Sequence, residues 1–165
     1  MNRKAFIVGI KKERLTLEEK NFLIKEKPWG VILFSRNIKN LSQLKSLVGS
    51  IKVIFKDKNY PIIIDQEGGR VSRLNKILDF SIFSQSFFGN IYKHNYEFFL
   101  RSYRIYVDTV CNILNDVGIN INTVPVLDIK KSKTSNFIND RSFSHDPNTV
   151  TKIGKLCIDL YKKNR

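Results

Sequence analysis

Residues 62–73 read IIIDQEGGRVSR, and this stretch decides the fold of the chain. Its first three residues are isoleucines that follow Pro61, a composition typical of a short strand buried on both faces of a parallel sheet. The strand is followed at once by Asp65 and Glu67, and then by two glycines and two arginines. In barrel enzymes, functional side chains gather at the carboxyl ends of parallel strands. We therefore expect a site directly after this strand.

The rest of the chain alternates between signals for strands and helices. We expect the other strands at residues 5–10, 31–34 and 119–126. A helix is predicted after Thr16, which forms a capping-box pattern with Glu19. The segment that follows residue 64 is expected to be a long loop that extends to about Asn90.

Three further helices are predicted from their apolar periodicity and their caps. One starts at Asn40 and repeats leucine, isoleucine and valine on one face; another spans residues 100–117 and stops at Gly118. The last starts at Asp146, with Pro147 in its first turn. Strands that alternate with helices predict βαβ units and a parallel α/β sheet, but the pattern leaves open whether the sheet is half of a barrel or a small open sheet.

The composition sets further limits. With 165 residues and 42% hydrophobic residues the chain is a globular domain, whereas a complete (β/α)8 barrel needs roughly 250 residues. The net charge of +14 would suit a nucleic-acid- or membrane-binding module, but the lysines are scattered and no nucleic-acid motif is present. We therefore interpret the charge as solvated surface and expect neither nucleic acid nor membrane as a partner.

Two cysteines and the chain's apolar runs bear on its cellular location. Cys111 and Cys157 fall on apolar helix faces, which predicts two buried, reduced thiols and no disulfide or metal pair. The apolar run of residues 5–10 is too short for a signal peptide, and no run approaches the roughly 18 residues of a membrane span. We expect a cytoplasmic protein.

Several motifs in register give the chain a family resemblance. The stretch at 62–73 resembles the signature of the bacterial β-N-acetylhexosaminidases of glycoside hydrolase family three. Four other segments agree in order with that family: WGVILFSRN at 29–37, QSF at 85–87, VPVLD at 124–128 and RSFSHDP at 141–147. The resemblance implies the N-terminal half, about four βα units with parallel strands, of a TIM (β/α)8 barrel. Residues 1–165 would then be one incomplete domain of this family.

The resemblance also implies an activity. The full enzyme would be a retaining exo-β-N-acetylhexosaminidase that releases terminal N-acetylglucosamine from muropeptides or related β-glycosides in peptidoglycan recycling, without metal or organic cofactor. The family places its nucleophile and its histidine acid/base after strands that would lie beyond Arg165. We therefore expect no catalytic group in this chain, no activity from it alone, and either self-association or pairing with a missing C-terminal half. A family-three β-glucosidase is the alternative enzyme.

The resemblance carries three substrate-binding residues onto this sequence. Asp65 would accept hydrogen bonds from hydroxyls of the terminal sugar, although an ion pair with Arg70 or Arg73 is an alternative role. Arg73 would lie near the substrate. Arg141 would donate to hydroxyls and to the N-acetyl carbonyl, unless it only pairs with Asp140 or Asp146.

The neighbouring residues are expected to support the pocket. Gly68 and Gly69 let the backbone turn with positive φ, and Arg70 would brace the loop. Glu67 is expected to pair with Arg70 or Arg73. Its two-residue separation from Asp65 suggests a retaining carboxylate pair, but the family assigns neither of them that role.

Three other polar residues are given structural roles. Asp128 is expected to end the fourth strand and to be structural. His145 and His94 are the only histidines of the chain, and we expect both to face solvent.

Overall fold

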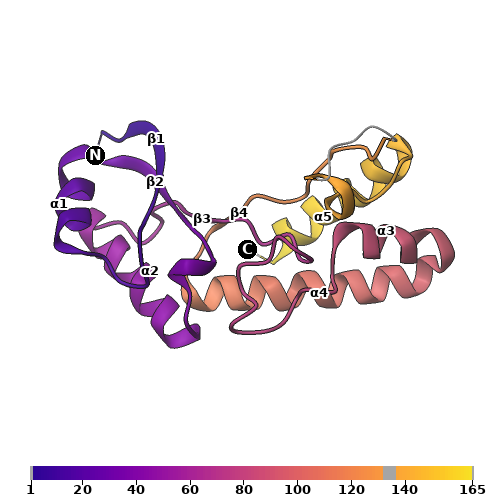
Figure 1. The fold of residues 1–165 in the computed structure, drawn as a ribbon, viewed down its shortest axis with the longest axis horizontal. Helices are drawn as coiled ribbons and strands as arrows, with labels where there is room; N and C mark the ends of the chain where they lie inside the picture. Colours follow the sequence, from indigo (N-terminus) through magenta and orange to yellow (C-terminus); the bar gives the residue numbers. More distant parts are fainter. Residues whose placement is uncertain (1, 132–136, 165) are drawn as a thin grey trace. The chain divides into compact units, whose positions relative to one another are not determined.

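The computed structural model describes residues 2–131 and 137–164, whose α/β fold contains a parallel sheet (Figure 1). The sheet has the order β1-β2-β3-β4, with every neighbouring pair parallel. Its strands are β1 (Lys4–Gly9), β2 (Pro28–Leu33), β3 (Ile62–Ile64) and β4 (Ile121–Asn122). The predicted fold class is thus confirmed for the sheet.

The helices begin where the caps predict. The helix α1 (Leu17–Glu26) starts after Thr16, whose side chain and that of Glu19 form the predicted capping box. The helix α2 (Leu41–Phe55) is capped by Asn40, and α5 (Pro147–Lys163) by Asp146. The remaining helical segments are η1 (Ser35–Asn37), α3 (Gln85–His94), α4 (Tyr96–Val117) and η2 (Asn139–Arg141).

Two expectations about elements are wrong. Residues 85–94 form helix α3 instead of belonging to a loop, because the Ser84 hydroxyl caps the Phe87 N–H and Phe88 provides a buried anchor. The fourth strand is shorter than predicted. The side chain of Asn120, not its backbone, takes the N–H of Ile62, and Pro125 has no N–H with which to continue a ladder.

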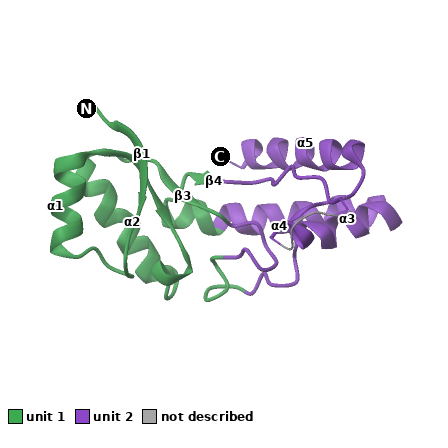
Figure 2. Ribbon diagram, turned by 45° about the horizontal axis from the view of Figure 1, so that its top comes forward, with its two compact units in different colours: residues 1–65, 73–78, 113–122 green, residues 66–72, 79–112, 123–165 purple. Residues whose placement is uncertain are grey.

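The chain divides into two compact units (Figure 2). Unit 1 comprises residues 1–65, 73–78 and 113–122, and it contains the whole sheet with α1 and α2. Its core joins the β-branched strands to the apolar face of α2, and includes Val31, Ile62, Ile64, Leu44 and Ile51, all fully buried.

Unit 2 comprises residues 66–72, 79–112 and 123–165, with α3, most of α4, and α5. Its core is aromatic. Phe88 lies edge-on to Tyr103 with ring centroids 4.8 Å apart, and Phe99 stacks on Tyr103 at 5.3 Å. Cys111 and Cys157 are buried, as predicted, and both are free thiols.

Candidate functional site

In unit 1, the buried strand β3 ends in Asp65, as the sequence predicts. The Asp65 carboxylate lies 3.5 Å from the Arg73 guanidinium, and each side chain leaves 24% of its surface exposed. The ion pair that we considered as an alternative role for Asp65 is therefore present. Because both side chains remain partly exposed, the pair still presents an acceptor and donors to a polar ligand.

The ring of Phe34, directly after β2, makes cation–π contacts with two guanidinium groups in the same unit. The Arg73 guanidinium lies 5.6 Å from the Phe34 ring centroid, and that of Arg36 lies 4.6 Å from it. Arg36 is fixed by its Nε, which donates to the Ile10 carbonyl at 3.0 Å. We did not predict these two residues as site residues, although both lie in the WGVILFSRN segment.

In unit 2, Glu67 and Arg141 form a two-pronged ion pair. Arg141 Nε and Nη2 each donate to a Glu67 carboxylate oxygen at 2.8 Å. The Glu67 side chain is only 4% exposed, so its charge needs this paired, planar partner. The expectation that Glu67 pairs with Arg70 or Arg73 is therefore wrong, and so is the alternative pairing of Arg141 with Asp140 or Asp146.

Arg70 instead lies against Asp140 of η2, with its Nε 2.8 Å from the carboxylate. It also donates to the Phe137 carbonyl at 2.5 Å. These two contacts connect residues far apart in the sequence and fit the role of a brace on the loop.

The two glycines adopt the predicted left-handed backbone, with φ of +88° at Gly68 and +61° at Gly69. A side chain at Gly68 would lie 2.1 Å from the Phe83 carbonyl oxygen. The loop is also fixed by Tyr106, whose hydroxyl donates to the Glu67 carbonyl at 2.9 Å. Burial raises the pKa of Tyr106, which keeps this hydroxyl neutral and able to donate.

Gln85 is a positioning residue, although the sequence marks it only as part of the QSF motif. It is 5% exposed, accepts a hydrogen bond from the Val126 N–H at 3.1 Å, and donates to the Arg141 carbonyl. It therefore connects the start of α3 to the backbone of the substrate-binding candidate Arg141. The place of Gln85 in the QSF motif is the only signal that the sequence offered for this role.

The remaining candidates lie apart from these contacts. Asp128 is exposed, and it lies after β4 instead of ending it, which corrects that expectation. Its carbonyl accepts from the Ser142 hydroxyl at 2.6 Å. His145 and His94 are exposed, as predicted.

Across residues 2–131 and 137–164, no group of three His, Cys, Asp or Glu side chains is placed to hold a metal ion. Over the same part of the chain, no helix combines the length and apolar character that a membrane span requires.

Comparison with known proteins gives a consistent family. Residues 6–164 match the model of the glycosyl hydrolase family 3 N-terminal domain. Beta-hexosaminidase A of Pseudoalteromonas piscicida is 33% identical over 137 residues, which cover 81% of this chain and 22% of that protein. A beta-hexosaminidase of Xanthomonas euvesicatoria pv. vesicatoria is 29% identical over 144 residues, with 87% of this chain and 42% of that protein covered. The chain thus spans less than half of these curated relatives.

Solved structures agree in fold. NagZ from Neisseria gonorrhoeae, crystallised with a zinc ion, superposes with a TM-score of 0.81 at 28% identity, over 98% of this chain and 48% of that one. The same protein in complex with N-trifluoroacetyl-D-glucosamine gives a TM-score of 0.78 at 27% identity, over the same shares of each chain.

Proposed function

The chain belongs to the glycosyl hydrolase family 3 N-terminal domain family, and from that premise we propose that it supplies sugar-binding residues to a β-N-acetylhexosaminidase. One observation carries the proposal. The buried strand β3 runs directly into a partly exposed carboxylate, Asp65, which is oriented by Arg73. Buried strands rarely end in such charges for reasons of packing, since exposing part of a charged pair at a strand end contributes little to stability.

The proposed roles follow from the chemistry of each side chain. Asp65 accepts hydrogen bonds from hydroxyls of a terminal N-acetylglucosamine, and Arg73 donates to the same sugar. Arg141 donates through the part of its guanidinium that Glu67 leaves accessible, since 28% of the Arg141 side chain is exposed. The likeness to a protein crystallised with N-trifluoroacetyl-D-glucosamine supports the choice of an N-acylated sugar.

Hydrolysis requires groups that we do not assign to these residues. A retaining glycosidase needs a nucleophile that forms a glycosyl-enzyme and an acid/base that changes roles between the two steps. We place both outside residues 1–165, so that the isolated chain binds sugar weakly and does not turn it over. The proposed substrates are cell-wall muropeptides in the cytoplasm, which places the complete enzyme in peptidoglycan recycling.

A chimaera tests the proposal. This chain replaces the matching N-terminal part of NagZ from Neisseria gonorrhoeae, and hydrolysis of 4-nitrophenyl N-acetyl-β-D-glucosaminide is measured. We expect turnover by the chimaera and none by the 165-residue chain alone. A folded chimaera that cleaves the β-D-glucoside in preference would favour the β-glucosidase alternative. A chimaera that melts cooperatively but cleaves neither glycoside would contradict the proposal.

A further inference from the structure

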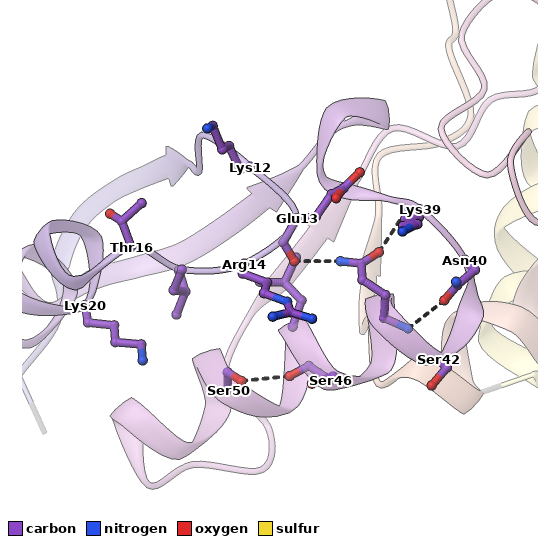
Figure 3. Close-up of a pocket in the computed structure, with 13 residues that line it drawn as sticks. Lys12, Glu13, Arg14, Thr16, Lys20, Lys39, Asn40, Ser42, Ser46 and Ser50 are labelled. Carbon is purple, nitrogen blue, oxygen red and sulfur yellow. Dashed lines mark hydrogen bonds between the residues drawn. The ribbon is translucent and has the colours of Figure 1, made fainter.

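Unit 1 also has a large hollow, and the residues that line it include neither Asp65 nor Arg73. Its volume is about 990 Å³, within the range of pockets that hold small-molecule ligands. It is lined by the segment that leads into α1 and by one face of α2 (Figure 3). We propose that this hollow binds a small anion of the phosphate class, independently of the sugar-binding role.

The charge of the lining favours an anion. Four cationic side chains line the hollow, and Glu13 is the only acidic one. The cations are Lys12, Arg14, Lys20 and Lys39. Figure 3 shows the Arg14 and Lys20 side chains extending toward α2, whereas Lys12 and the Glu13 carboxylate point away from them. Among the ion pairs of the described residues, none involves Arg14 or Lys20.

Three serines of α2 contribute hydroxyl groups to the lining. Ser42, Ser46 and Ser50 are spaced four residues apart, so they follow one face of the helix, and all three line the hollow. Ser50 is engaged by the Ser46 carbonyl, to which its hydroxyl donates at 2.8 Å. A phosphate has several acceptor oxygens, which suits a guanidinium, an ammonium and hydroxyl donors together.

The loops that carry the cations are fixed by two amide side chains. Gln43 on α2 donates to the Glu13 carbonyl at 2.7 Å and accepts from the Lys39 N–H at 2.8 Å. The fully buried Asn37 donates to the carbonyls of Ile10 and Lys12 at 3.1 Å and 2.9 Å. The backbone just before Arg14 and the backbone of Lys39 are therefore anchored before any ligand arrives, which lowers the entropic cost of binding.

The shape favours a small anion over a nucleic acid. A nucleic acid is typically bound along a stripe of cations that follows its phosphate backbone, or on an exposed aromatic platform. Here two cations, Arg14 and Lys20, extend toward one hollow, and no aromatic side chain lines it. The N-termini of α1 and α2 are already engaged, since Thr16 and Asn40 accept hydrogen bonds from the N–H groups of Glu19 and Gln43.

Calorimetric titration of the chain with inorganic pyrophosphate tests the site. The double substitution Arg14→Gln/Lys20→Gln removes two cations from the hollow, and we expect the Kd to rise by about tenfold or more. The matched control, Lys58→Gln/Lys76→Gln, removes two exposed cations of the same unit that lie outside the hollow, and its Kd should stay within about twofold of the unsubstituted chain.

A second variant separates hydrogen bonding from charge. Ser42→Ala/Ser46→Ala leaves the net charge unchanged and should still weaken binding by about fivefold or more, because it removes two donors. Titration with adenosine diphosphate distinguishes a nucleotide-borne diphosphate from a free one, and tighter binding of either supports the site. Thermal melts of all variants confirm that they fold.

Three results would overturn the proposal. The first is no measurable heat with pyrophosphate at concentrations on the order of millimolar, where a site with several charged hydrogen bonds should fill. The second is an equal loss in the control double variant, which would indicate a diffuse field of the basic chain. The third is tighter binding of single-stranded RNA than of pyrophosphate, weakened equally by the double substitution in the hollow and by the control double substitution.

Discussion

At the scale of single residues, Arg73 and Arg141 have different surroundings, although the sequence predicts the same substrate-binding role for both. Arg73 and Asp65 are each 24% exposed, and their closest charged atoms are 3.5 Å apart. Arg141 holds a nearly buried carboxylate in a tight two-pronged pair at 2.8 Å. Loss of the first pair should therefore affect ligand binding, whereas loss of the second should also affect folding.

The first prediction concerns the partly exposed pair of Asp65 and Arg73. In the chimaera, Asp65→Ala and Arg73→Ala should each lower kcat/KM by about tenfold or more, because each removes a charged hydrogen bond to the sugar. Their melting temperatures should change little, since a partly exposed pair whose charged atoms are 3.5 Å apart contributes roughly 0–1 kcal/mol. Asp159→Ala and Arg104→Ala, at exposed positions on helices, are the controls. Wild-type kinetics in both test variants would leave the pair with a structural role alone.

The second prediction concerns the buried pair. Arg141→Ala should lower the free energy of unfolding by about 3 kcal/mol, because it leaves the Glu67 carboxylate buried without its partner. Arg104→Ala, on the exposed face of α4, should change it by less than about 0.5 kcal/mol. Chemical denaturation measures both. Equal stability of the two variants would show that Glu67 finds another partner or water when Arg141 is removed.

The third prediction concerns the thiols. Burial raises the pKa of Cys111 to about 11 and that of Cys157 to about 12. Because the thiolate is the reactive form, neither should react with an aromatic disulfide reagent at about pH 8 until the chain is unfolded. Unfolded thiols ionise near pH 8.5, below the folded values, so raising the pH above that point should also destabilise the fold. Rapid labelling of the native chain would contradict the burial of both residues.

At the scale of elements, the packing of α3 depends on a glycine. The helix approaches η2 closely, and a side chain at Gly89 would lie 1.7 Å from the Phe143 carbonyl oxygen. By contrast, a side chain at Gly49 on α2 would meet nothing within 4 Å. The two helical glycines therefore have opposite roles, since one permits contact and the other only weakens its helix.

The fourth prediction compares these two glycines. Gly89→Ala should destabilise the chain by about 2 kcal/mol or more, because α3 or the backbone at Phe143 must shift. Gly49→Ala makes the same chemical change on a helix and should stabilise by up to about 1 kcal/mol. Thermal or chemical denaturation reads out both values. A neutral Gly89→Ala variant would mean that α3 packs less closely than the structure shows.

At the scale of the whole molecule, the sheet presents two edges. In the order β1-β2-β3-β4, the terminal strands β1 and β4 each pair on one side. Large apolar side chains on the strands are also accessible, with 48% of Ile7 and 43% of Trp29 exposed. Unpaired strand edges next to apolar surface promote association with other chains.

The fifth prediction is therefore self-association of the 165-residue chain, measured by gel filtration with light scattering. Ile7→Lys places a charge on the edge strand β1 and should reduce the association. Val53→Lys introduces the same charge on the exposed face of α2, where the side chain is 74% exposed, and should have little effect. A monodisperse monomer of 19.3 kDa with a cooperative melt would contradict the prediction.

The sequence by itself determined the elements whose signals are local. The isoleucines of 62–64, the box formed by Thr16 and Glu19, and the cap at Asp146 all lie within a few residues of the structure that they specify. The sequential strand order followed from the resemblance to half of a barrel, because consecutive strands are neighbours in a (β/α)8 barrel. The motifs, which follow the family's order along the chain, were sufficient to identify the family.

Only the tertiary structure decided the contacts between distant segments. Glu67 and Arg141 are 74 positions apart, and Asn120 reaches Ile62 across 58. Such pairings depend on how the chain closes on itself, and a buried carboxylate takes the donor that the fold brings within reach, not the nearest arginine in the sequence. The hollow beside α2 has the same origin, because Gln43 and Asn37 assemble it from loops that no local pattern connects.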